Sequence, residues 1–193
     1  MLLGVNVTLA GLLLINGAAR DGVAGGLPSS GWEPHGGGVL VLGTGATLSG
    51  CAIVSCAADG RGGAINAAEK VLLLNVSIRE CVAVSGGAVW ASAAVELAGG
   101  TNITGCQAFE GGAVYVEGPG GSLAMSRAAL QGNQAKSAGG GVYAESNASV
   151  ALGTGAVVLG NVAGANGGGL ALLDSCALSL DGDSLVEGNQ AMG

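Results

Sequence analysis

Two short motifs recur in phase along this chain, and their common spacing constrains its fold more than any other feature. The first is a glycine pair or triplet followed by an aliphatic residue. The second is an aliphatic residue followed three positions later by Asn or Cys. Successive copies are 24 to 28 residues apart for the first motif and 25 to 28 for the second. Two motifs that share one period are typical of a repeat protein.

Six copies of each motif can be aligned. The aliphatic residues of the first motif are Val39, Ile65, Val89, Val114, Val142 and Leu170. The second motif occurs as Ile53/Cys56, Ile78/Cys81, Ile103/Cys106, Leu130/Asn133, Val158/Asn161 and Val186/Asn189. An earlier copy is expected at Leu13/Asn16, followed by an irregular insertion over residues 17–35. We therefore interpret residues 1–193 as a single repeat domain, a piece of a longer array that continues into neighbouring coils of a parent protein.

The composition selects strands as the repeating unit. Glycine supplies 40 of the 193 residues, yet 49% are hydrophobic and only 10% are charged, so neither collagen nor a disordered chain fits. Stretches such as Val114-Tyr115-Val116-Glu117 alternate aliphatic and other residues, which is the pattern of a strand. Glycine clusters suit the corners between strands. The expected fold is all-β, a parallel β-helix of about six to seven coils of 24–28 residues.

The repeat also predicts which side chains fill the interior. One wall would contribute the first-motif residues and those two positions later, from Val39 and Val41 to Leu170 and Leu172. The other walls would contribute Leu74, Val76, Ile78, Val95, Leu97, Ile103, Val150, Leu152 and Val158. Stacked aliphatic columns of this kind explain why only 3% of the residues are aromatic.

Charge and hydropathy exclude some partners. The net charge of −7 argues against a nucleic-acid-binding surface. No apolar run reaches 18 residues, so no transmembrane helix is expected in this chain. The apolar segment Met1 to Ile15 lacks the basic start of a signal peptide, and its alternation favours a repeat strand.

The two motifs together resemble the GGA[ILV] and FxxN repeats of the chlamydial polymorphic outer-membrane proteins. Here Ile, Leu or Val replaces Phe, and Cys replaces Asn in three copies. The resemblance covers residues 36–193. It implies a right-handed parallel β-helix of the pectin-lyase-like type that is displayed at a cell surface, where such repeats act as adhesins.

The Asn and Cys residues of the second motif are interpreted as a stacked structural column. Stacked amides hydrogen-bond along the axis, and a buried free Cys packs as a small apolar residue. Whether any of the five cysteines form disulfides is left open. No metal site is expected, because neither a CxxC pair nor a nearby His occurs. Asp181 and Asp183 form the only close carboxylate pair, which suits either calcium or, more simply, a solvated turn.

The sequence contains no recognisable catalytic centre or cofactor motif. A Gly-x-Ser-x-Gly elbow, a phosphate-binding Walker loop and a dinucleotide fingerprint are all absent from it. We therefore expect a chain that is not an enzyme and holds no cofactor.

Four asparagines form N-x-[ST] sequons and are candidates for N-glycosylation: Asn6, Asn75, Asn102 and Asn147. All four have the outward parity of the expected strands, which suggests a secreted glycoprotein. The alternative is that strand exteriors simply favour Asn, Ser and Thr.

One set of residues resembles a recognition surface. Trp90, Tyr115 and Tyr143 each follow a first-motif residue directly, so three rings would line one outer wall at a spacing of about 4.8 Å. Glu117 and Glu145 lie two positions further on. Such a strip could bind glycan through ring stacking and carboxylate hydrogen bonds. The simpler interpretation is aromatic packing between strands, with no ligand.

The function expected from these observations is a non-enzymatic structural or adhesion module, extracellular or at a cell surface, with glycans or surface proteins as partners. The alternative is a polysaccharide-binding or polysaccharide-active β-helix whose catalytic residues lie outside this segment.

Overall fold

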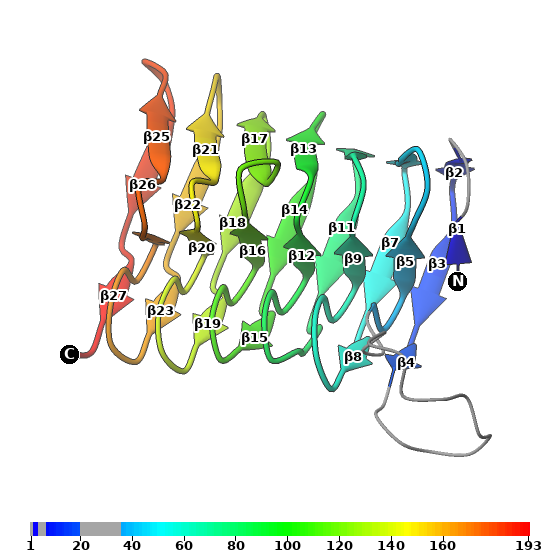
Figure 1. Ribbon diagram of the computed structural model, residues 1–193, viewed down its shortest axis with the longest axis horizontal. Helices are drawn as coiled ribbons and strands as arrows, with labels where there is room; N and C mark the ends of the chain where they lie inside the picture. The colour runs from blue at the N-terminus through cyan, green and yellow to red at the C-terminus, as the bar shows by residue number, and fades with distance from the viewer. Residues whose placement is uncertain (1, 4–6, 20–35) are drawn as a thin grey trace.

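The structure, a computed structural model, describes residues 2–3, 7–19 and 36–193, and over these residues the chain is all β, without a helix. Successive coils lie side by side along the long axis, from the blue N-terminal coil to the red C-terminal coil (Figure 1). Each strand pairs in parallel with the equivalent strand of the next coil. The parallel β-solenoid predicted from the repeat is therefore confirmed.

Three walls of the solenoid are sheets of seven strands each. The first wall contains β1 (Leu2–Leu3), β5 (Val39–Val41), β9 (Ile65–Ala67), β12 (Val89–Ala91), β16 (Val114–Glu117), β20 (Val142–Glu145) and β24 (Leu170–Leu172). The second contains β2 (Val7–Ala10), β6 (Ala46–Ser49), β10 (Val71–Leu74), β13 (Ala94–Ala98), β17 (Ser122–Ser126), β21 (Ser149–Leu152) and β25 (Ala177–Leu180). The third contains β3 (Leu13–Ile15), β7 (Ala52–Val54), β11 (Ser77–Arg79), β14 (Asn102–Thr104), β18 (Ala129–Gln131), β22 (Val157–Leu159) and β26 (Leu185–Glu187).

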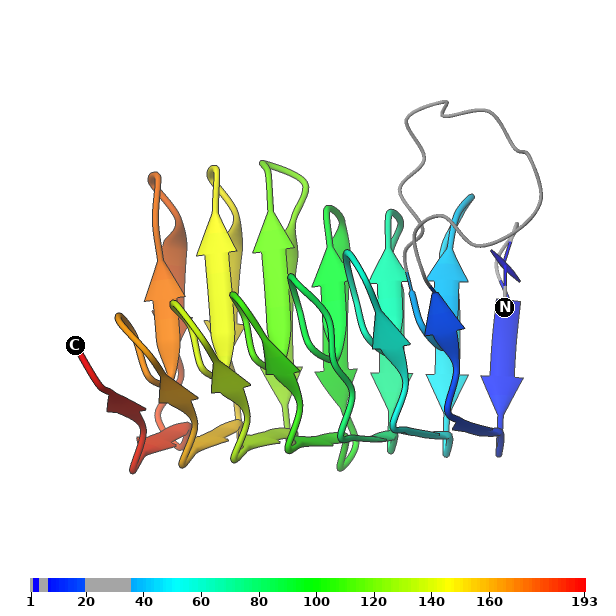
Figure 2. The same cartoon turned by 90° about the horizontal axis from the view of Figure 1, so that it is seen from below.

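A fourth wall consists of strands of two residues each. These strands are β4 (Ala18–Ala19), β8 (Ala57–Ala58), β15 (Gln107–Ala108), β19 (Gln134–Ala135), β23 (Val162–Ala163) and β27 (Gln190–Ala191). Bridges from Ala57 to Val82 and from Val82 to Gln107 connect the two groups of strands in this wall. Seen from below, the coils again form successive layers along the same axis (Figure 2).

The glycine motif is explained by two different demands at the corner before the first wall. Gly62 and Gly86 have φ angles of 64° and 66°, in the left-handed region that glycine adopts without strain. The next glycine is close to the following coil. A Cβ at Gly63 would lie 2.2 Å from the carbonyl oxygen of Gly87, and one at Gly87 would lie 2.3 Å from that of Gly112. Any side chain there would push the coils apart.

The interior follows the predicted register. Val89 pairs with Val114 and Val114 with Val142, and none of the three side chains is exposed. The predicted inward position of Leu74 is wrong. Leu73 is buried between Leu48 and Leu97, and Leu74 faces the other way. The bend at Asn75, with a φ of 53°, resets the alternation, so Val76 and Ile78 return to the interior as expected.

The first coil also differs from the expectation by one residue. Leu14, not Leu13, pairs with Ile53, and Leu13 is 59% exposed. Gly17 therefore occupies the position that Cys56 holds in the next coil, and the early copy of the motif is Leu14/Gly17 rather than Leu13/Asn16. The chain is still regular at Ala18–Ala19, where β4 pairs with β8, although the predicted insertion included these residues. The rest of that insertion, residues 20–35, lies outside the described residues.

The asparagine column forms a ladder of amide hydrogen bonds along the axis. Asn133 and Asn161 are fully buried. The side-chain amide of Asn133 donates to Oδ1 of Asn161 at 2.9 Å and to the carbonyl oxygen of Ile103 at 3.1 Å. Asn161 repeats both bonds, to Asn189 at 2.9 Å and to Leu130 at 3.0 Å. Each Oδ1 also accepts a bond from a backbone N–H of the preceding coil, so the corner is fully paired.

Three cysteines continue the same column toward the N-terminus. Cys56, Cys81 and Cys106 are fully buried, and each thiol donates to the carbonyl oxygen two residues earlier. The neighbouring Cys106 thiol and burial raise the pKa of Cys81, and burial raises the pKa of Cys56. All five cysteines are free, which answers the disulfide question that the sequence left open.

The amide ladder predicts the effect of a single substitution. Asn161→Ala removes the acceptor of the Asn133 amide and the donor to Leu130, and it leaves buried polar groups without partners. Each such group costs about 1–3 kcal/mol, so the free energy of unfolding is expected to fall by several kcal/mol. Urea unfolding of Asn161→Ala and of Asn102→Ala, whose amide is half-exposed on β14, measures the difference. Equal losses in the two variants would contradict a stabilising ladder.

Candidate functional site

The three aromatic residues that the sequence suggested as a strip do lie in register on the first wall. Trp90 of β12 pairs with Tyr115 of β16, which pairs with Tyr143 of β20. The two tyrosine rings are stacked, with centroids 5.0 Å apart and an angle of 23° between their planes. All three side chains point away from the interior, because their neighbours in each strand fill the main core. The predicted alignment is therefore confirmed.

These rings are covered, however, which matches the alternative of aromatic packing between strands rather than an open strip. Trp90 is 4% exposed, and Tyr115 and Tyr143 are 6% exposed each. With Ala138 and Ala171 they form a small apolar cluster of their own, separate from the interior of the solenoid. Ala138 belongs to the corner just before β20, so the chain outside the strands contributes to the cover. Buried ring faces leave no flat surface on which a sugar can stack.

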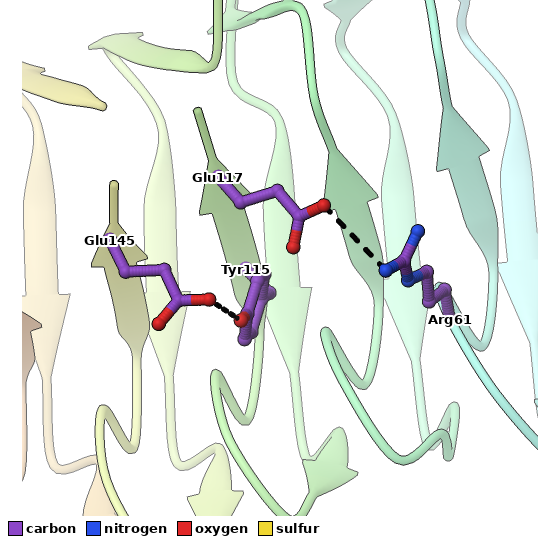
Figure 3. Close-up of polar contacts among 4 residues, drawn as sticks. All are labelled: Arg61, Tyr115, Glu117 and Glu145. Carbon is purple, nitrogen blue, oxygen red and sulfur yellow. Dashed lines mark hydrogen bonds and ion pairs between the residues drawn. The ribbon is translucent and has the colours of Figure 1, made fainter. Parts of the chain in front are cut away.

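A network of polar contacts surrounds the rings. Glu145 accepts hydrogen bonds from the hydroxyl groups of Tyr115 and Tyr143, the second at 3.3 Å. The guanidinium of Arg61 lies 4.3 Å from the centroid of the Trp90 ring and 3.6 Å from a carboxylate oxygen of Glu117. Figure 3 shows Glu145 against Tyr115 on one side and Arg61 reaching toward Glu117 on the other. Glu117 and Glu145 thus take part in contacts within the protein rather than forming an open row of carboxylates.

The electrostatics of this cluster follow from burial next to acidic groups. Burial raises the pKa of Tyr143 to about 12, with a further contribution from Glu110, and it also raises the pKa of Tyr115. Burial and the charge of Glu145 raise the pKa of Glu110 above its ordinary value. The two phenols therefore remain protonated at neutral pH and act as donors to Glu145.

One polar atom of the cluster lacks a partner. Nε1 of Trp90 is the single buried side-chain nitrogen or oxygen without a hydrogen bond in the part of the chain that the structure describes. The cation–π contact with Arg61 uses the ring face and leaves this N–H unpaired. The cluster is held mainly by apolar packing and by ionic contacts on the outside of the first wall. The three rings together with Arg61, Glu117 and Glu145 are called the clasp.

A hollow of about 350 Å³ lies at the edge of the clasp. Its lining includes Glu110, Ser137, Tyr143 and Asn166. It places a carboxyl group of raised pKa beside a tyrosine and an amide, a combination found at sites that handle protons or hydroxyl groups. This hollow, unlike the buried ring faces, is a concave part of the surface beside the first wall.

The predicted glycosylation sites differ in accessibility. Asn75 and Asn147 are exposed at bends between strands, with φ angles of 53° and 65°. Asn102 is half-exposed on β14, and its Oδ1 accepts a hydrogen bond from the hydroxyl of Thr104 at 3.1 Å. Asn6 lies outside the described residues.

The carboxylate pair near the C-terminus sits in an exposed turn. Asp181 Oδ1 accepts a bond from the backbone N–H of Gly182, and Asp183 Oδ1 accepts one from that of Gly155. Over residues 2–3, 7–19 and 36–193, no three His, Cys, Asp or Glu side chains converge in a way that could hold a metal ion. The same residues contain no helix long and apolar enough to cross a membrane.

The sequence did not point to a groove on the fourth wall. Its volume is about 420 Å³, and it spans three coils; its lining is Val82, Ala83, Val84, Gln107, Ala108, Phe109, Gln134 and Lys136. Phe109 is 52% exposed, in contrast to the covered rings of the first wall. One sequence pattern could have indicated this groove. Larger residues recur on both sides of an alanine at the repeat spacing, as in Gln107-Ala108-Phe109.

Comparisons of the chain with models of known protein families, with curated proteins and with solved structures found no match. The function is therefore inferred from the geometry of the chain's own residues.

The raised pKa of Glu110 predicts a pH-dependent effect of neutralising it. A carboxyl whose pKa is higher in the folded state stabilises the fold most when protonated, and this contribution is lost as the pH rises through the raised value. Glu110→Gln is therefore expected to be more stable than the wild type at neutral pH, by up to about 1 kcal/mol. The advantage should disappear in acid.

Denaturant unfolding between about pH 3.5 and pH 8 checks this, because the range spans the ordinary pKa of a glutamate. Glu187→Gln, at an exposed position of β26, is the control. A gain for Glu110→Gln that is the same at both ends of the range would contradict the assigned cause.

Proposed function

We propose that this chain is a non-enzymatic structural or adhesion module of a cell surface or extracellular matrix. The observation that carries the proposal is the unbroken in-register pairing of all coils, with three sheets of seven strands around one apolar interior. Such a body is a rigid rod with flat outer walls, suited to holding surface groups at fixed spacing. Each coil adds about 4.8 Å to its length, so array length sets how far the module reaches.

The geometry of the two motifs supports the proposed kinship with the polymorphic outer-membrane repeats. The glycines of the GGA motif occupy corners where coils approach closely, as at Gly63 and Gly87. The asparagines of the second motif form the amide ladder through Asn133 and Asn161. The glycine motif therefore has a role that recurs from coil to coil, and the asparagine motif has one in the C-terminal coils, as expected of a family built on them. The finer proposal is a right-handed solenoid of the pectin-lyase-like type, with surface proteins or glycans as partners.

Exposed sequons support export of the chain. Asn75 and Asn147 are the two with accessible side chains at bends, where a glycan would project away from the walls. Attached glycans would also keep these edges of the rod soluble despite a hydrophobic fraction of 49%.

A polysaccharide-binding or polysaccharide-active solenoid is the second candidate, with its main catalytic residues outside this segment. The hollow beside Tyr143 favours it, because Glu110 there has a raised pKa and lies among hydroxyl and amide groups. The carboxyl group of Glu110 could exchange a hydrogen bond with a sugar hydroxyl.

Binding and turnover assays on the same preparation separate the two candidates. The folded chain, immobilised on beads, is expected to bind cells or matrix saturably and to leave a panel of polysaccharides intact. Val114→Asp places an unpaired charge in the interior, costs several kcal/mol and provides an unfolded control. Absence of binding by the folded chain would contradict an adhesive role. Polysaccharide cleavage that is lost in Glu110→Gln would favour the second candidate.

Expression in a eukaryotic secretory system tests the export argument. Glycans are expected at Asn75 and Asn147, which intact mass and peptide mapping detect. Asn75→Gln and Asn147→Gln should each remove the mass of one glycan without loss of fold, since both side chains are exposed. Secreted protein without any glycan would remove this support for an extracellular module.

A further inference from the structure

The groove on the fourth wall combines an exposed apolar floor with exposed polar side chains. Val82, Val84 and Phe109 are 45%, 50% and 52% exposed. Large apolar side chains that lie together in a groove of about 420 Å³ are a feature of ligand sites rather than of an ordinary solvated wall.

The register of the solenoid creates this arrangement. Val82 bridges to Gln107, and Gln107 pairs with Gln134, so these three side chains form one outward row along the axis. The alanine after each of them, including Ala83 and Ala108, points inward and is buried. The residue after each alanine points outward again. Val84, Phe109 and Lys136 therefore form a second row beside the first.

The polar groups of the groove are unpaired within the described part of the chain. The side-chain amides of Gln107 and Gln134 make no hydrogen bond there, and the ammonium of Lys136 has no carboxylate partner. Each amide offers both donors and an acceptor, and the two lie about 4.8 Å apart along the axis. Lys136 is the one charged side chain in the lining of the groove, so the local charge there is positive although the protein as a whole carries 13 acidic and 6 basic side chains. This local charge can pair with an anionic group of a ligand.

We propose that this groove binds an acidic oligosaccharide. One pyranose ring lies with its C–H face on Phe109. Its hydroxyl groups exchange hydrogen bonds with the amides of Gln107 and Gln134. A carboxylate or sulfate on the same or the next sugar pairs with Lys136. This proposal specifies the class of ligand that the adhesion module would bind, and to that extent it rests on the proposed function.

Two features favour a sugar over an apolar protein segment. A protein side chain packed on Phe109 would desolvate both glutamine amides without offering each of them a donor and an acceptor. A sugar ring has an apolar face and a rim of hydroxyl groups, which matches the apolar floor between polar side chains. The rows also run along the axis, so a linear glycan can continue over neighbouring coils.

Calorimetric titration with oligosaccharides of matched length tests the site. The arms are a neutral, a uronate-containing and a sulfated oligosaccharide, so the source of the negative charge is distinguished. We expect the acidic ligands to bind more tightly than the neutral one, with an affinity that falls as salt is added. Phe109→Ala should weaken binding of all ligands about tenfold or more. Lys136→Gln should remove the preference for acidic ligands and the salt dependence.

A matched control is available on the same wall. Gln134→Ala is expected to weaken binding several-fold, whereas Gln190→Ala, exposed at the equivalent position two coils away, should have no effect. Thermal unfolding of each variant confirms that it is folded, since all these side chains are exposed.

Binding of no oligosaccharide by the folded wild-type chain would overturn the site, as would affinities unchanged by both Phe109→Ala and Lys136→Gln. Displacement of bound oligosaccharide by an apolar peptide that binds more tightly would assign the groove to a protein partner instead. If Phe109→Ala adheres to cells as well as the wild type does, the site is overturned and the proposed function stands. If the wild type does not adhere but binds acidic oligosaccharide through Phe109, the proposed function fails and the site stands.

Discussion

Parallel pairing of each coil with the next in an unchanged register is the constraint on which the rest of this structure depends. Val89 lies against Val114 and Val114 against Val142, so every side chain has its repeat equivalents as axial neighbours. A favourable contact between like residues is therefore multiplied along the axis, and so is an unfavourable one. This is why glycine recurs where successive backbones almost touch, as at Gly63 and Gly87.

The same constraint explains how one column is built from two residue types. Asn133 and Asn161 bond to each other and to carbonyl groups that the corner would otherwise leave unpaired. Toward the N-terminus, the thiols of Cys56 and Cys81 occupy equivalent space, and each donates to a carbonyl oxygen of its own coil. Oδ1 of Asn133 accepts the backbone N–H of Cys106, which joins the two halves of the column. The C-terminal half therefore has the stronger polar connection between coils.

The first and fourth walls differ in which side chains they leave exposed to solvent. On the first wall, Glu145 and Arg61 close over the aromatic rings, so the most conspicuous side chains of the sequence stabilise the rod. On the fourth wall, Phe109 is open, and the glutamine amides beside it are free to bind a ligand. The two surfaces are on different walls, so recognition at the groove does not require disruption of the clasp.

The sequence by itself determined the repeat, the parallel solenoid, most of the apolar interior and the alignment of Trp90, Tyr115 and Tyr143, because these follow from period and alternation. It did not determine where the alternation is reset. Leu74 was predicted to face inward because the left-handed residue Asn75, which resets the alternation, cannot be recognised from period alone. The Leu13 copy was predicted one position too early, and a shift of one position reverses the two faces of a strand. Periodicity shows that a side chain points outward, but not whether another segment of the same chain covers it. Only the tertiary structure decided that the rings of the first wall are buried and that Phe109 is exposed, since the cover comes from residues of other coils, such as Ala138 at a corner and Ala171 on β24.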